Sequence, residues 1–206
     1  MSFYKVLVIG DVGVGKTSMV NRIVYNTFTE KYKATIGCEF GLKIMEINGE
    51  PVRIQLWDLA GQDRLGGISR LYCRDANGAL VVSDVSRQET LQKAPLWKGN
   101  VDENVRLADQ SPIPMVLCAN KYDMQSPDKV MTQQELDEFS EQNNFVGAYF
   151  TSAKNGMNAE EALTRLVTEV IKKCPNKKDS VEENITSNAA QRLDRNKSKA
   201  KKKNCC

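Results

Sequence analysis

The fold of this chain is decided by one stretch, Gly10-Asp11-Val12-Gly13-Val14-Gly15-Lys16-Thr17. It fits the pattern G-x-x-x-x-G-K-[ST], which has meaning only between a strand and a helix. The apolar run 6–9 before it is typical of a buried parallel strand, and Val20, Ile23 and Val24 recur after it at helical spacing. Glycines let the backbone wrap closely, so that successive N–H groups can point at phosphate oxygens. The stretch therefore predicts a loop that binds the phosphates of a nucleotide.

Two side chains of this loop carry chemistry. Lys16 would reach the β- and γ-phosphates as a point charge, and the Thr17 hydroxyl would bind Mg²⁺. The positive end of the following helix dipole adds to the attraction. The other positions predicted to contact the nucleotide here are Asp11, Val12, Gly13, Val14, Gly15 and Ser18. The alternative is a glycine-rich turn with an accidental lysine, and the strand and helix on its flanks argue against it.

Length and charge limit the class of protein. The 206 residues, 41% of them hydrophobic, suit one domain followed by a tail. Nine basic and four acidic residues lie from Pro175 onward, whereas the part before it has twenty basic and twenty-two acidic residues. A near-neutral domain disfavours a nucleic-acid-binding surface. No apolar run approaches the roughly 18 residues of a membrane span. The six cysteines form no C-x-x-C pair, which favours a reducing, cytosolic compartment.

Strands and helices are expected to alternate along the domain. Between 39 and 56, apolar residues alternate with polar or small ones on both sides of Asn48-Gly49, a strong hairpin signal. Further strands are expected at 78–82, 114–119 and 149–151. One helix is expected to begin at the capping box 132–135, and an amphipathic helix over 162–171 is expected to close the domain. This order predicts an α/β, doubly wound, mainly parallel sheet with one antiparallel hairpin strand. Ligands of such sheets bind at the carboxyl ends of the strands.

A D-x-x-G motif follows the hairpin strand. Asp58 stands where a carboxylate could hold Mg²⁺, directly or through water, and Gly61 offers a backbone N–H to a γ-phosphate. Gln62 is placed to orient an attacking water and is the candidate catalytic residue. Alone, this motif is most often a plain turn. Together with the phosphate loop it predicts hydrolysis of a nucleoside triphosphate.

The base is predicted by Asn120-Lys121-Tyr122-Asp123, which follows another strand. The Asp123 carboxylate can accept two hydrogen bonds from the N1–H and the 2-amino group of guanine, and adenine lacks that amino group. The Lys121 stem can lie against the base plane. A backbone N–H of Ser152-Ala153-Lys154 can reach the guanine carbonyl oxygen. Each motif is weak alone, but their order at successive strand ends predicts guanine specificity, with Asn120 as part of the site.

Over residues 3–174 these motifs resemble those of a small GTPase of the Ras superfamily. The resemblance implies the P-loop GTPase fold, with a six-stranded sheet and helices on both faces. The stretch 34–37 resembles the first switch loop, so the resemblance makes Thr35 the residue that reports the γ-phosphate, with its hydroxyl on Mg²⁺. It also makes Phe28 the aromatic against the guanine and Tyr32 a flap over the phosphates. The alternative for both aromatics is an ordinary loop residue.

Within the superfamily, the chain is most similar to the Rab family. The stretch 36–40 resembles the Rab effector-side motif, and 57–64 resembles the second switch. The residues that the resemblance assigns to effector binding are Ile36, Phe40, Trp57 and Tyr72, the last three as an aromatic triad. Core packing is the alternative for two of these aromatics, at 40 and 57. Four stretches look closest to one Rab subgroup, which serves melanosomes, other lysosome-related organelles and mitochondrion-associated traffic: 54–58, 83–87, 96–98 and 111–114.

Three departures from the family pattern bear on activity and regulation. Val12 stands where Ras itself has glycine, and its branched side chain could crowd the attacking water and an incoming arginine finger. Leu65-Gly66-Gly67 replaces the aromatic-led segment of the second switch, which affects contacts with regulators. Cys73 and Asp75 alter the Tyr-Tyr-Arg-Gly-Ala run of the family, which bears on subgroup rather than on activity.

The stretch 175–206 reads as a flexible basic tail, because it has too little apolar surface to offset the entropy of ordering. A C-a-a-X signal would need cysteine where Lys203 stands. Cys205 and Cys206 instead resemble the Rab substrate for double geranylgeranylation, with a disulfide as the alternative. Two lipid chains anchor stably, and the lysines attract an anionic leaflet.

These observations predict a GTP-hydrolysing switch that regulates vesicle traffic, with a GTPase domain at 1–174 and a tail at 175–206. GTP with Mg²⁺ would order both switch loops, and effectors would bind only that ordered form. The resemblance implies an exchange factor, an activating protein, an escort that hides the lipids, and a monomeric domain that cycles between cytosol and the cytosolic face of endosomal, lysosome-related or vesicle membranes. A GTP-locked binding module is the first alternative, favoured by Val12 and opposed by Gln62. A phosphoryl-transferring P-loop kinase is the second, opposed by the guanine motifs.

Overall fold

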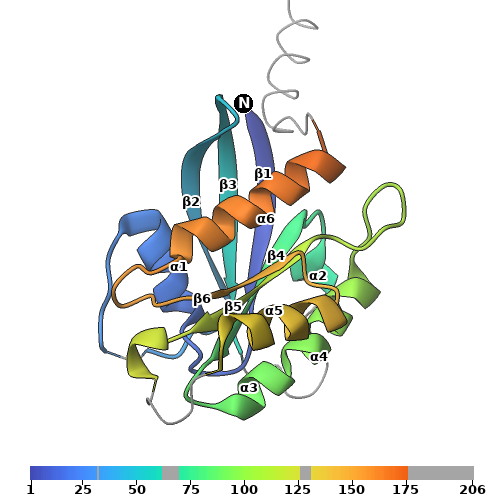
Figure 1. The fold of residues 1–206 in the computed structure, drawn as a ribbon. Coiled ribbons are helices and arrows are strands. Elements are labelled where there is room, and N and C mark those ends of the chain that lie inside the picture. The colour runs from blue at the N-terminus through green and yellow to red at the C-terminus, as the bar shows by residue number, and fades with distance from the viewer. Residues whose placement is uncertain (32, 62–69, 126–130, 176–206) are drawn as a thin grey trace, which may run out of the picture.

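A six-stranded sheet forms the centre of the molecule, in the order β2-β3-β1-β4-β5-β6 (Figure 1). The computed structural model describes residues 1–31, 33–61, 70–125 and 131–175. The strands are β1 Ser2–Ile9, β2 Cys38–Ile47, β3 Glu50–Leu59, β4 Gly78–Asp84, β5 Met115–Asn120 and β6 Gly147–Phe150. Among them, β2 and β3 pair antiparallel and every other neighbouring pair is parallel. The predicted sheet, mostly parallel with one antiparallel hairpin strand, is confirmed.

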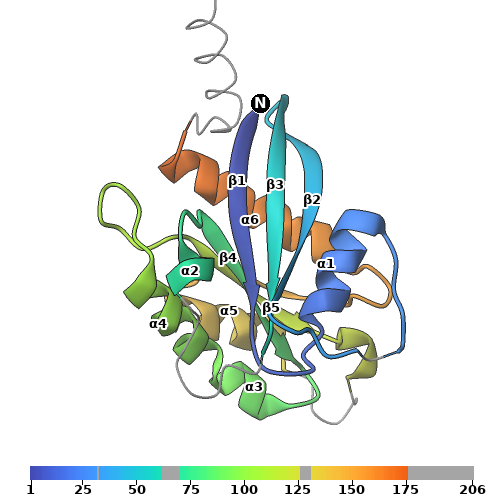
Figure 2. The ribbon, with the colours of Figure 1, turned by 180° about the vertical axis from the view of Figure 1, so that it is seen from behind.

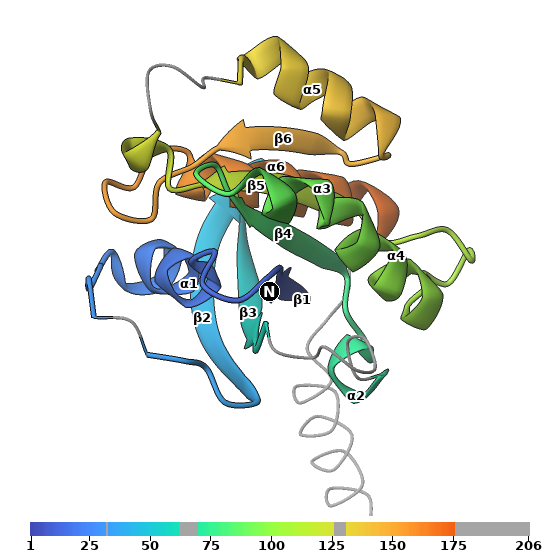
Figure 3. The same cartoon turned by 90° about the horizontal axis from the view of Figure 1, so that it is seen from below.

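Helices cover both faces of this sheet. They are α1 Lys16–Tyr25, α2 Arg70–Cys73, α3 Gln88–Gln92, α4 Ala94–Asn104, α5 Gln133–Gln142 and α6 Ala159–Lys173, with a 3₁₀ turn at Tyr122–Met124. Figure 1 shows α1 and α6 on one face of the sheet, and Figure 2, the view from behind, shows α2, α3 and α4 on the opposite face. Seen from below in Figure 3, α4 lies on the opposite side of β4 from α1.

Two cores result from the alternation of side chains along the central strands. Val6 and Val8 of β1 face the core that α1 and α6 close, whereas Leu7 and Ile9 face the core under α3, α4 and α5. Because β1 is covered on both sides, its sequence is a continuous apolar run rather than an alternating one. The buried run 6–9 was therefore a sound basis for predicting a central parallel strand.

The carboxyl ends of the parallel strands meet at one edge of the sheet. The loops that follow β1, β3, β5 and β6 leave from this edge, while the N-terminus lies at the opposite edge, at the top of Figure 1. There the Tyr4 hydroxyl donates to the carbonyl of Cys174, at 2.9 Å, just beyond the end of α6. The predicted site motifs therefore gather at the edge where ligands of doubly wound sheets bind.

Several boundaries differ from the sequence expectations. The capping box is confirmed, because Thr132 accepts from the Glu135 N–H and Glu135 accepts from the Thr132 N–H. The strand expected at 114–119 begins at Met115, since Pro114 has no N–H to donate to the ladder. The short helices α2 and α3 and the 3₁₀ turn were not predicted, because segments of three to five residues show no periodicity. In the described ranges, no helix is both long and apolar enough to cross a membrane.

Candidate nucleotide site

A cavity of about 670 Å³ opens at the carboxyl edge of the sheet. The predicted nucleotide-binding residues that line it are Val12, Gly13, Gly15, Lys16, Thr17, Ser18, Phe28, Thr35, Gly61, Asn120, Lys121, Asp123, Ala153 and Lys154. These residues come from five separate segments of the chain, and the tertiary structure brings them around one space. Tyr32, Gln62 and the terminal cysteines lie outside the described residues.

Three predicted residues lie behind the lining of the cavity. The Asp11 carboxylate points toward α4, where it accepts hydrogen bonds from Lys93 Nζ at 3.0 Å and Trp97 Nε1 at 2.9 Å. Val14 is fully buried in the core. The buried Ser152 hydroxyl donates to Asp123 Oδ1 at 2.5 Å, so Ser152 orients the carboxylate that was predicted to contact guanine. Their side chains support the site rather than face its ligand.

The backbone of residues 10–17 is shaped for an anion. Gly15 has a φ of 96°, and a Cβ there would lie 2.5 Å from Asn120 Nδ2, so only glycine fits. Gly15 is also the N-cap of α1 and has no side chain to satisfy the first N–H groups of that helix. These donors are therefore open to a ligand, at the positive end of the helix dipole.

Lys16 is held over the loop with only 6% of its surface exposed. Its Nζ donates to the carbonyls of Gly10 and Asp11, both at 2.9 Å. Burial lowers the pKa of Lys16 to about 8, against the opposing charges of Asp58 and Asp11. A phosphate beside the amine would favour its charged form and raise this pKa again. The charges of Asp58 and Asp11 thus do not fully offset the burial of the amine, and a bound anion would stabilise its charged form further.

Three side-chain oxygens converge beside the loop. Thr17 Oγ1 lies 2.8 Å from Thr35 Oγ1 and donates to Asp58 Oδ2 at 2.5 Å. Thr35 Oγ1 donates to the same carboxylate oxygen at 3.3 Å. Burial raises the pKa of Asp58, although hydrogen bonds from both threonines and the charge of Lys16 oppose it. The other oxygen, Asp58 Oδ1, is buried and has no hydrogen-bond partner among the described residues. A hard oxygen set with an orphaned carboxylate oxygen fits a divalent cation such as Mg²⁺.

The opposite end of the cavity presents the predicted base-binding groups. Lys121, with a φ of 65°, starts the 3₁₀ turn that carries Asp123 into the cavity, where its side chain is exposed. Asn120 is 1% exposed and acts as an anchor: its Nδ2 donates to the Val14 carbonyl at 2.9 Å, and its Oδ1 accepts the Ala153 N–H at 3.1 Å. Asn120 therefore ties together the loops that follow β1, β5 and β6.

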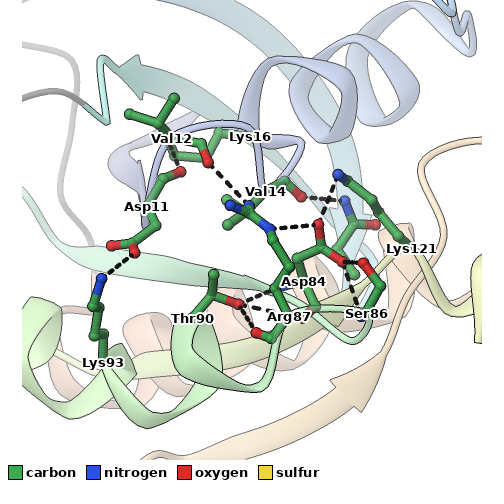
Figure 4. Close-up of polar contacts among 11 residues, drawn as sticks. Asp11, Val12, Val14, Lys16, Asp84, Ser86, Arg87, Thr90, Lys93 and Lys121 are labelled. Atoms are coloured by element: carbon green, nitrogen blue, oxygen red, sulfur yellow. Dashed lines mark hydrogen bonds and ion pairs between the residues drawn. The ribbon is translucent and has the colours of Figure 1, made fainter.

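Two supporting residues were missed by the sequence reasoning. Asp84 ends β4 with 1% exposure, and its Oδ2 lies 2.7 Å from Lys121 Nζ (Figure 4). Arg87 Nε donates to the same oxygen at 3.2 Å, and Arg87 Nη2 donates to the Val12 carbonyl at 3.0 Å. A carboxylate at the end of a parallel strand was a usable signal for Asp84. No sequence signal pointed to Arg87.

Comparison with known proteins identifies this arrangement. A model of the Ras family matches residues 5–172. Rab-32A of Dictyostelium discoideum is 44% identical over 173 residues, which are 82% of this chain and 78% of that protein. Human Rab-32 is 43% identical over 87% of this chain and 81% of its own length. Rat Rab-7L1 is 41% identical over 82% of each chain.

The chain belongs to the Rab family of small GTPases. It therefore binds GTP and GDP, hydrolyses GTP, and regulates intracellular membrane traffic as a switch that recruits effectors. Rab membership, and the resemblance to the subgroup of lysosome-related organelles, are both confirmed. As in the family generally, regulators and effectors act on the protein, and it cycles on and off endomembranes.

The residues expected to contact effectors of this Rab lie in β2, in β3, just before β2 and in α2. The rings of Phe40 and Trp57 stack with their centroids 6.0 Å apart. Phe40 is 64% exposed and Ile36 is 92% exposed, so core packing does not account for either of them. Trp57 and Tyr72 are half-buried and pack against the core under α3 and α4. The Lys5 amine lies 3.8 Å from the centre of the Trp57 ring and supports it by a cation–π contact that was not predicted.

Proposed function

We propose that GTP occupies the cavity with its phosphates on residues 10–17 and its guanine against Asp123. In this proposal Thr17, Thr35 and Asp58 hold Mg²⁺. The observation that carries it is the buried Oδ1 of Asp58, which lacks a partner among the described residues, while Oδ2 of the same carboxylate accepts hydrogen bonds from the two threonine hydroxyls. Bound Mg²⁺ would neutralise charge on the phosphate oxygens. Thr35 belongs to the segment between α1 and β2. GTP with Mg²⁺ would order this segment through the Thr35 hydroxyl, so Thr35 would report whether a γ-phosphate is present.

The close approach of Gly61 supports its proposed contact with the γ-phosphate. A Cβ at Gly61 would lie 2.6 Å from Lys16 Nζ and 2.7 Å from the Val12 nitrogen. Only a residue without a side chain allows the loop after β3 to come so near to the phosphate loop. We propose that the Gly61 N–H contacts the γ-phosphate and that Gln62 orients the attacking water. Hydrolysis then removes the contacts that hold both switch loops.

Val12 is proposed to slow this hydrolysis, since it lines the cavity and its backbone nitrogen lies close to Gly61. The test is phosphate release from the GTP-loaded full-length protein. We expect Gln62→Leu to release phosphate at least about tenfold more slowly than the wild type, because the water loses its orientation. We expect Val12→Gly to release it about tenfold faster.

Retention of GTP, measured by filter binding, is the control for both variants. Release by Gln62→Leu at the wild-type rate, with GTP retained, would remove Gln62 from the mechanism. Release by Val12→Gly at the wild-type rate would contradict the proposed crowding. An activating protein that supplies an arginine can be added to show whether Val12 also obstructs the arginine.

We further propose that the GTPase domain ends at 174 and that 175–206 is a basic tether with lipids on Cys205 and Cys206. The contact of Tyr4 with the Cys174 carbonyl supports this boundary, because it ties the end of α6 to β1. The lipids would require prenylation enzymes and an escort protein in the cytosol. Similarity to Rab-32 and Rab-7L1 supports a location on endosomal or lysosome-related membranes.

The tether is tested by cell fractionation. We expect the double variant Cys205→Ser, Cys206→Ser to lose its membrane fraction, because the basic residues alone bind a bilayer weakly. Cys206→Ser alone retains one lipid site and should give partial, reversible association. A double variant that stays fully on membranes would refute the lipid anchor.

A further inference from the structure

Two carbonyl groups of the phosphate loop are held from behind by side chains of other loops. Arg87 Nη2 donates to the Val12 carbonyl at 3.0 Å (Figure 4). Asn120 Nδ2 donates to the Val14 carbonyl at 2.9 Å. A peptide unit is planar and trans, so its C=O and its N–H point in opposite directions. Each carbonyl that is drawn outward therefore turns the next N–H, of Gly13 or Gly15, toward the cavity that both glycines line.

Arg87 is itself fixed by the end of β4. Its Nε donates to Asp84 Oδ2 at 3.2 Å, and its backbone carbonyl accepts the Thr90 hydroxyl at 2.7 Å. Asp84 is 1% exposed, and Ser86 donates to its other oxygen through both N–H and hydroxyl, at 3.0 and 2.6 Å. Burial alone would raise the pKa of Asp84, but hydrogen bonds from Lys121 and Ser86 outweigh it and lower the pKa. The Asp84 carboxylate therefore stays ionised and keeps its hydrogen bond with Arg87.

The same carboxylate reaches the base-binding side of the site. Asp84 Oδ2 lies 2.7 Å from Lys121 Nζ as well as 3.2 Å from Arg87 Nε. A continuous path therefore runs from Lys121 through Asp84 and Arg87 to the Val12 carbonyl. Arg87 does not belong to the described residues that line the cavity, so it can act on a nucleotide only through the loop.

We infer that Arg87 is a positioning residue for the phosphate loop. It fixes the peptide between Val12 and Gly13 so that the Gly13 N–H faces the phosphates, and through Asp84 it couples this peptide to Lys121. The inference rests on the proposed placement of the nucleotide in the cavity. Its consequence is a longer residence time of GDP and GTP, because the N–H donor is oriented before the nucleotide arrives.

The test compares nucleotide dissociation from full-length wild type and Arg87→Met. Methionine keeps the length of the side chain but cannot donate to the Val12 carbonyl. We expect fluorescent GDP and GTP analogues to dissociate about tenfold faster, the size expected when a hydrogen bond from a charged donor is lost. The amide resonance of Gly13 in the GDP complex should move upfield, because its hydrogen bond to the phosphate weakens.

Arg165→Met is a matched control. Arg165 Nε donates to the Val146 carbonyl at 3.0 Å, and Arg165 pairs with Glu169 at 3.1 Å. Like Arg87→Met, the substitution Arg165→Met therefore removes one hydrogen bond to a carbonyl and one contact with a carboxylate, but it does so away from the phosphate loop. The two arginine side chains are also similarly exposed, 39% for Arg87 and 43% for Arg165. Arg165→Met should leave both nucleotide dissociation and the Gly13 resonance unchanged.

Each other outcome overturns the inference. Dissociation from Arg87→Met at the wild-type rate would show that the Val12 contact does not matter. Equal acceleration in Arg165→Met would indicate a general loss of stability. Slower hydrolysis without faster dissociation would make Arg87 a catalytic group. A Gly13 amide resonance that does not move when GDP binds to the wild type would instead refute the proposed placement of the nucleotide, which distinguishes the two failures.

Discussion

Asp123→Asn is expected to weaken GDP and GTP binding about a thousandfold and to favour xanthine nucleotides instead. The Asp123 carboxylate faces the cavity, where it can accept hydrogen bonds from both the N1–H and the 2-amino group of guanine. An asparagine keeps one acceptor but turns an NH₂ donor toward one of these donors. Two hydrogen bonds to a charged acceptor, at about 1.5–3 kcal/mol each, account for an effect of this size.

Xanthine differs from guanine by a carbonyl in place of the 2-amino group, so the new amide donor gains an acceptor. The measurement is competition of GDP, xanthosine diphosphate and ADP against a fluorescent GDP analogue. The substitution preserves Oδ1, which accepts the Ser152 hydroxyl, so the thermal unfolding midpoint of the nucleotide-free protein should not change. Ser152→Ala is the comparison variant: it removes only the orientation of the carboxylate, and we expect it to weaken binding about tenfold. GDP affinity within tenfold of the wild type in Asp123→Asn would show that another group recognises the base.

Gly10→Ala is expected to reduce the free energy of unfolding by about 3 kcal/mol or more. Gly10 follows β1 with a φ of 141°, and a Cβ there would overlap the carbonyl oxygen of Val82 in the neighbouring strand β4. The overlap is with backbone at the centre of the sheet, which cannot rotate away as a flexible side chain would. A positive φ costs about 1–2 kcal/mol for an L-residue, and overpacking of a core costs about 1–3 kcal/mol more.

Gly99→Ala is the matched control for this substitution. Gly99 lies inside α4, and a Cβ there would meet nothing within 4 Å. Alanine in place of glycine in a helix interior should raise stability by about 0.5–1 kcal/mol, so the two variants should change stability in opposite directions. Urea unfolding with the same nucleotide concentration in every sample measures both, because bound nucleotide adds to stability. If Gly10→Ala lowers the free energy of unfolding by less than about 1 kcal/mol, β1 and β4 must move apart at little cost, and the predicted overlap would be contradicted.

The phosphate loop and the sheet were predictable because their signals are local. A buried run before the glycines and helical spacing after them describe β1 and α1 without reference to the rest of the chain. The motif that carries Asp123 was weak alone and became a base-binding signal through the order of the motifs at successive strand ends. Its Asn120, however, was predicted only as a member of the site, and the structure uses its side chain to join three loops.

The supporting contacts were not predictable, because they join residues far apart in the chain. Arg87 and the Val12 carbonyl are 75 positions apart, and Asn120 and the Val14 carbonyl are 106 apart. The exposure of Phe40 and the half-burial of Trp57 depended in the same way on strand pairing, since core packing was an alternative for both residues that the sequence left open.

The sequence by itself determined that this protein has a phosphate loop, a guanine motif and an alternating α/β order. Helical periodicity, buried runs and turn residues act over a few positions, so each segment carries its own signal, and the order of the segments along the chain supplies the rest. The tertiary structure decided which side chains hold the phosphate loop in its binding shape. The strand order places β4 between β1 and β5, and this neighbourhood alone brings Asp84 and Arg87 between the phosphate loop and Lys121.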